Sequence, residues 1–126
     1  MAPTLRSGGV YVLDTRYYQR HPVERGDIVV FRYRGVTCIK RVYALPGERL
    51  VLLEYADGEG NEIIPATELQ VFRRLERSGR LVGRRVSELT VPPDHYFVLG
   101  DNQHVSWDSR SFGCLPKGAI VGRVNL

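Results

Sequence analysis

Short apolar stretches, separated every few residues by Gly, Pro or Asp, run through almost the whole of this 126-residue sequence. Apolar residues follow a β rhythm in almost all of these short runs, which is typical of strands. The pattern therefore predicts a mostly β chain, a small antiparallel β-barrel or folded sheet with little helix. The expected strands are Gly9–Leu13, Asp27–Tyr33, Val36–Ala44, Arg49–Tyr55, Glu62–Ile64, Leu69–Arg73, His95–Leu99 and Ala119–Val124.

Turn-forming residues indicate how two pairs of these strands connect. Tyr33-Arg34-Gly35 is short enough for a hairpin, and Asp57-Gly58-Glu59-Gly60 contains residues that tolerate positive φ angles. Both turns predict antiparallel pairing of the strands beside them. Helix is expected only as single turns, at Thr15–Arg20, where His21-Pro22 ends it, and at Gly83–Leu89.

Length and composition limit the class of protein. A chain with 43% hydrophobic and 25% charged residues forms one globular domain, which we expect to span residues 1–126. No apolar stretch approaches the ~20 residues that cross a bilayer, and no leader follows Met1, so the chain as written is expected to be soluble. The net charge of +4 and seven tyrosines suit a basic barrel that binds nucleic acid, an alternative that the dispersed arginines do not favour.

The two cysteines, Cys38 and Cys114, form no metal-ligand or disulfide-framework spacing. We expect them to be small, semi-buried residues, and whether they pair stays open. The sequence predicts neither a metal site nor another cofactor.

Lys40 is the residue that most needs an explanation. Of the 18 Lys and Arg residues only Lys40 and Lys117 are lysine, and the alternation of Val36–Ala44 places Lys40 on the apolar face of its strand. Burial disfavours the charged form of a lysine and lowers its pKa, whereas an arginine stays charged. Lys40 is therefore a candidate general base. The alternative is a lysine at a strand edge whose ammonium group reaches water.

A second polar stretch, Leu99–Gly113, begins where the expected strand His95–Leu99 ends. In an extended segment Ser106, Asp108 and Arg110 lie on one side, because they are two residues apart. They form either a polar network that positions a base or part of a solvated loop.

Four groups of residues resemble the sequence boxes of type I signal peptidases. They occur in the family's order and together span nearly the whole chain. The groups are Met1–Leu5; Arg25–Phe31; Ile39–Val42 with Leu45–Glu48; and Gly100–Asn102 through Ser106–Gly113, with Gly122 and Arg123.

The resemblance implies a membrane-anchored serine endopeptidase with a Ser/Lys dyad and a mostly antiparallel β core. Such an enzyme removes signal peptides from exported proteins after small residues at the −1 and −3 positions. Lys40 then matches the general base, and Ser106 matches the serine that orients this lysine. Asp108 and Arg110 match a supporting salt bridge.

The same resemblance implies where substrate binds. Met1, Leu5 and Ile39 match residues of the substrate pocket, and the strand leading into Lys40, which includes Cys38, matches the strand with which the signal peptide pairs. The implied partners are signal peptides of exported preproteins and the membrane surface, reached through an anchor, and no nucleic acid. The complete product is expected in the plasma membrane, with the catalytic core on the extracytoplasmic face.

The main departure from the family concerns the nucleophile. In the family motif the nucleophilic serine stands directly before the methionine of Met-x-Pro-Thr-Leu, and here that methionine is Met1. The oxyanion-hole residue, one substrate-flanking strand and the anchor also precede this point. We therefore expect the chain as written to be an inactive, truncated core; a non-catalytic peptide-binding relative is the alternative. The edge left without its neighbouring strand is expected to allow self-association.

Overall fold

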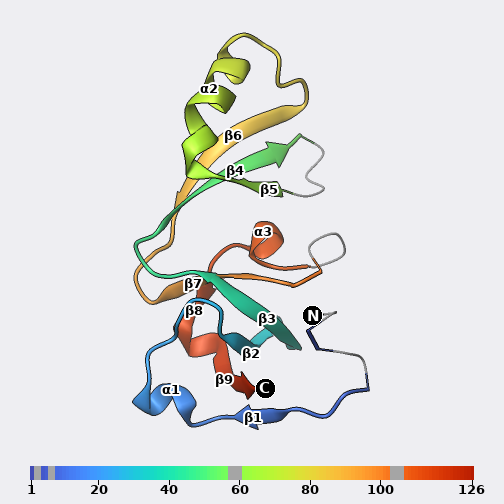
Figure 1. The fold of residues 1–126 in the computed structure, drawn as a ribbon, viewed down its shortest axis with the longest axis vertical. Helices are drawn as coiled ribbons and strands as arrows, with labels where there is room; N and C mark the ends of the chain where they lie inside the picture. The colour runs from blue at the N-terminus through green and yellow to red at the C-terminus, as the bar shows by residue number, and fades with distance from the viewer. Residues whose placement is uncertain (2–3, 6–7, 57–60, 103–106) are drawn as a thin grey trace.

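Strands dominate the computed structural model of the chain, which describes residues 1, 4–5, 8–56, 61–102 and 107–126 (Figure 1). The helical elements in this part are all short. In chain order the elements are β1 (Val12–Asp14), α1 (Tyr17–Arg20), β2 (Ile28–Tyr33), β3 (Val36–Ala44), β4 (Arg49–Tyr55), β5 (Asn61–Ile64), η1 (Ala66–Glu68), α2 (Leu69–Arg77), β6 (Arg84–Thr90), β7 (His95–Leu99), α3 (Ser109–Phe112), β8 (Leu115–Pro116), η2 (Lys117–Ala119) and β9 (Ile120–Asn125).

The larger sheet has the strand order β1-β9-β2-β3-β7-β8, and its neighbouring strands are antiparallel. β2 pairs along its whole length with Val36–Arg41 of β3, and the predicted hairpin joins the two strands. In the turn, Arg34 has φ 50° and Gly35 has φ 79°, the pair of positive angles that a two-residue hairpin loop matching the strand twist requires. The hairpin predicted at Tyr33-Arg34-Gly35 is therefore confirmed.

One edge of β3 is only partly covered. β7 pairs with β3 from Arg41 to Ala44, whereas Val36–Lys40 pair only with β2 among the described residues. The first half of β3 therefore has one edge on which no described strand lies.

The smaller sheet has the order β5-β4-β6 and is also antiparallel. Its central strand, β4, is buried on both faces. Leu50 and Leu52 pack in a cluster with Phe97 of the larger sheet, whereas Val51 and Leu53 pack in a second cluster. Leu69 and Phe72 cover that second cluster, and Figure 1 shows α2 beyond the smaller sheet, at the top of the molecule.

The predicted fold class is confirmed, since the chain is mostly antiparallel β with few short helices. The predicted bounds of three strands, Val36–Ala44, Arg49–Tyr55 and His95–Leu99, are those observed. The helical turn expected at Thr15–Arg20 is present as α1. The expected turn Asp57–Gly60 lies outside the described residues, although the strands that flank it, β4 and β5, pair antiparallel as expected.

Two predicted elements are wrong. Leu69–Arg73 was expected to be a strand but begins α2, because Leu69 and Phe72, three residues apart, lie on the helix face that covers the smaller sheet. Gly83–Leu89 was expected to be a helical turn but falls on β6, because this segment pairs with β4, with Val86 opposite Leu53. In both cases a distant partner decided the local conformation.

None of the helices in the described part of the chain has the length and apolar character needed to span a membrane.

Candidate active site

Lys40 is half-buried in β3, at the end of the open part of its edge. It lies opposite Val29 of β2, which is fully buried, and Val42, two residues along the same face, is also buried. Cys38 lies opposite Phe31 and packs against the same cluster. The alternation read from the sequence thus assigned Lys40 to the correct face, beside the core of the larger sheet.

The other face of the strand carries Ile39, which is exposed and lies opposite Val30. Met1 and Leu5 pack in a cluster that contains Val30. Met1, Leu5 and Ile39, all predicted to bind substrate, are therefore on one face of the larger sheet. Cys38, the fourth such residue, lies on the opposite face with Lys40.

Asp101 links the start of the chain to the residue that follows Lys40. Its carboxylate accepts two hydrogen bonds from Arg41, from Nε and Nη2, each 2.9 Å long, and a third from the hydroxyl of Thr4. The backbone N–H of Asp101 donates to Met1 Sδ over 3.4 Å. The Arg41 guanidinium, with help from Thr4, lowers the pKa of the Asp101 carboxyl. No sequence signal identified this link, because its partners are far apart in the chain.

Asp108 and Arg110 form an ion pair, with 3.0 Å between Arg110 Nη2 and Asp108 Oδ2. Asp108 is fully buried, caps α3 by accepting from the backbone N–H of Arg110, and also accepts from the N–H of Gly100 over 3.1 Å. The hydroxyl of Ser109 accepts a bond from the N–H of Val98, a contact that the sequence did not indicate. Together these bonds fasten α3 to the end of β7.

Ser106, predicted to orient Lys40, lies outside the described residues. The Asp108–Gly100 bond nonetheless joins the two ends of the segment that contains it. How Ser106, Asp108 and Arg110 act on Lys40 remains a prediction.

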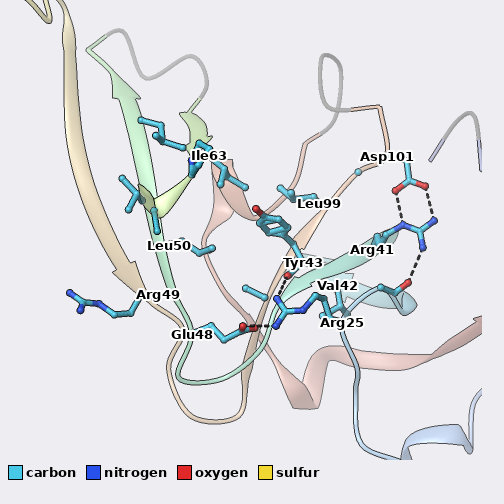
Figure 2. Close-up of a pocket in the computed structure, with 17 residues that line it drawn as sticks. Arg25, Arg41, Val42, Tyr43, Glu48, Arg49, Leu50, Ile63, Leu99 and Asp101 are labelled. Atoms are coloured by element: carbon cyan, nitrogen blue, oxygen red, sulfur yellow. Dashed lines mark hydrogen bonds and ion pairs between the residues drawn. The ribbon is translucent and has the colours of Figure 1, made fainter. Parts of the chain in front are cut away.

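A groove of about 680 Å³ lies next to these residues, between the second half of β3 and the strands β4 and β5. We call it the β3–β5 groove. Figure 2 shows the Arg41–Asp101 pair on one side of it and the Arg25–Glu48 pair on another. Arg25 donates both to Glu48, over 2.5 Å, and to the carbonyl of Tyr43, over 3.1 Å, and it lowers the pKa of Glu48. The sequence did not predict this groove.

Among the described residues, no group of three or more His, Cys, Asp and Glu side chains is arranged to hold a metal ion.

The antiparallel β fold is that of a known class of peptidase. Residues 1–126 match the family model described as signal peptidase, peptidase S26. The chain therefore belongs to the type I signal peptidase family, whose members are serine endopeptidases, and the resemblance read from the sequence is confirmed.

Individual relatives agree with this assignment. The chain is 37% identical to signal peptidase I of Bacillus caldolyticus, with all of this chain and 72% of that protein aligned. It is 32% identical to the probable signal peptidase I-1 of Synechocystis sp., with 97% of this chain and 63% of that protein aligned. The crystal structure of a signal peptidase I from Enterococcus faecalis V583 is similar, with a TM-score of 0.51, 27% identity, and coverage of 83% of this chain and 98% of that one.

Proposed function

We propose that residues 1–126 are the catalytic core of a signal peptidase I that cuts signal peptides from exported proteins after small residues at −1 and −3. Lys40 is its general base. The nucleophile is a serine directly before Met1 in the complete protein, where the family motif has it. The complete protein is held in the plasma membrane, with this core on the extracytoplasmic face.

One observation carries the proposal: the link through Asp101 holds Met1 beside the strand that carries Lys40. Met1 and Lys40 belong to opposite faces of the larger sheet. We infer that a residue attached to Met1 passes around the open edge of β3 to reach the lysine, at the edge on which a signal peptide adds as a strand.

The chemistry that follows uses one proton and one water. The Lys40 amine takes the proton of the serine hydroxyl, whose oxygen attacks the carbonyl carbon of the residue at −1. The bond to the mature protein breaks, and its leaving nitrogen takes the proton from Lys40. Water, deprotonated in turn by Lys40, hydrolyses the acyl-enzyme and releases the signal peptide. Arginine has no accessible neutral form and cannot replace Lys40 in these steps.

Ser106 orients the lysine in this proposal, and Asp108 and Arg110 hold the segment that carries Ser106. The buried bond from Gly100 to Asp108 supports this assignment, because it fixes the separation of the segment's two ends. A general base that is held in a defined geometry accelerates the reaction more than one whose position varies.

The test is cleavage of a signal peptide with alanine at −3 and −1 by the complete gene product, including the residues before Met1. We expect Lys40→Arg to lower kcat by about 100-fold or more, the range for loss of a general base. Ser106→Ala is expected to cause a smaller loss, because the base remains.

Lys117→Arg is the matched control, since Lys117 is the chain's other lysine and is exposed in η2. Full activity in Lys40→Arg would rule out the general-base role. An in-frame stop codon directly before Met1 would rule out the position proposed for the serine.

A further inference from the structure

We propose that the β3–β5 groove binds the residues that follow the scissile bond, the first residues of the mature protein. This inference rests on the proposed function and extends it to the other half of the substrate. None of the residues predicted from the sequence to bind substrate, Met1, Leu5, Cys38 and Ile39, lines this groove.

The position of the groove is the first support for this proposal. It begins at Arg41, directly after Lys40, where β7 joins β3 and the open edge ends. Asp101 lines it and also binds Thr4 and the sulfur of Met1. A peptide that lies along Val36–Lys40 and passes the lysine therefore leaves the open edge at the mouth of the groove.

The chemistry of the residues that line the groove is the second support. Leu50, Ile63 and Leu99 provide an apolar wall, as Figure 2 shows. The charges at the rim are largely satisfied by one another, in the Arg25–Glu48 and Arg41–Asp101 pairs. A site with an apolar wall and paired charges favours an uncharged, apolar side chain over a free charge. A volume of about 680 Å³ lies within the roughly 300–1,000 Å³ of typical ligand sites.

The strand at the far side of the groove, β5, is the third support. β5 is an edge strand of the smaller sheet, and both Ile63 and Ile64 line the groove. No described strand pairs with its outer edge. An extended peptide bonds to such an edge through its backbone, so a segment of varied sequence is accepted. This suits the start of mature proteins, which differ from one another.

The experiment uses the complete gene product and two substrates with the same signal peptide, one with a single residue after the scissile bond and one with five, including leucine. We expect kcat/KM to be about tenfold higher for the longer substrate, the scale of an apolar side chain filling a pocket. Ile63→Trp, which fills the groove, and Ile63→Ala, which removes its wall, are expected to bring this ratio close to one. Val71→Trp, on the exposed face of α2, is the control and keeps the wild-type ratio.

Equal kcat/KM for the two substrates in the wild type would overturn the inference and leave the proposed function intact. Failure to cleave either substrate would overturn the proposed function and the inference with it. Retention of the wild-type ratio in both Ile63 variants would overturn the groove as the site.

A second measurement does not depend on turnover. A substrate carrying a photoreactive phenylalanine three residues after the scissile bond is irradiated with the Lys40→Arg protein. Labelling of peptides that contain Leu50 or Ile63 supports the proposal, and labelling confined to other segments overturns it. A dimer that Ile63→Trp dissociates would also overturn it, because a second copy would then occupy the groove.

Discussion

Asp101 is the residue on which the geometry of the candidate site most depends. Its carboxylate binds Arg41, next to the proposed base, and Thr4, close to the start of the chain. The Asp101 side chain is 15% exposed and that of Arg41 is 35% exposed, so water screens their attraction only in part. This half-buried pair contributes both to the stability of the folded state and to the placement of Met1.

We expect Asp101→Asn to lower the free energy of unfolding at pH 7 by about 1–2 kcal/mol, since it removes a bidentate charged pair. The folded pKa of Asp101 is lowered, below an unfolded value of about 3.9. Its contribution is therefore complete above the unfolded pKa and is lost as the pH falls through the folded pKa. Urea unfolding of both proteins at several pH values should show a difference that is constant above about pH 5 and shrinks below about pH 4.

Asp94→Asn is the control, because Asp94 is exposed and asparagine tolerates its positive φ of 57°. A difference between wild type and Asp101→Asn that grew towards low pH would contradict the assignment.

Asp108 differs from Asp101 in being fully buried. We expect Asp108→Ala to cost about 3 kcal/mol or more, because it removes the buried ion pair with Arg110, the acceptor for the N–H of Gly100 and the N-cap of α3. Urea unfolding at neutral pH measures this cost. Ser111→Ala, at an exposed position of the same helix, should change stability by less than about 0.5 kcal/mol. A similar small change in Asp108→Ala would show that the ion pair does not hold the segment.

The residues of the site differ in how far the sequence alone could place them. Asp108 and Arg110 are two apart, so their contact is local; the spacing left it as one of two alternatives, and the family resemblance implied it. Lys40 was assigned to its face by strand alternation, which is also a local property. The link from Arg41 to Asp101 crosses 60 positions of sequence, and only the fold brings those two residues together.

At the scale of elements, β3 and α2 show two opposite outcomes. β3 was predicted with its observed bounds, because nine residues of alternating pattern and a tight hairpin at one end agree. The first residues of α2, Leu69–Arg73, were predicted as a strand, because apolar residues follow a β rhythm almost throughout the chain. Its apolar residues Leu69 and Phe72 gain their burial from the smaller sheet, which the segment's own pattern does not reveal.

The helical state of α2 is tested by a proline within it. Arg74 is exposed, and no ion pair to it is present among the described residues. We expect Arg74→Pro to lower the free energy of unfolding by about 3 kcal/mol, because it removes a helix hydrogen bond and its ring clashes with the preceding turn. Arg74→Ala should be nearly neutral in the same urea titration. Equal stability of the two variants would contradict the helix.

At the scale of the whole molecule, the two sheets share a core rather than merely adjoining. Ala44 and Phe97 of the larger sheet pack with Leu50 and Leu52 of the smaller one. Cys114 packs against this shared cluster, whereas Cys38 packs against the cluster of the larger sheet, and both thiols are free. The two cysteines therefore do not form a disulfide in this structure, because each packs against a different cluster.

We expect both cysteines to be alkylated after unfolding in urea without a reductant. In the folded protein Cys114 should react slowly with iodoacetamide, because burial raises the pKa of its thiol and the thiolate is the reactive form. Its rate should rise to that of a free thiol in urea. Mass spectrometry of digested protein measures both results, and a peptide linking Cys38 to Cys114 would contradict them.

The sequence by itself determined the mostly β class, the hairpin at Arg34 and Gly35, the face that carries Lys40 and the family. Each of these depends on residues close together in the chain, or on ordered motifs within it. The tertiary structure decided the helix at α2, the strand at β6, the Asp101 link and the β3–β5 groove. These features arise where segments that are distant in sequence come into contact. Burial and charge pairing at these contacts outweigh the weaker local preferences of each segment.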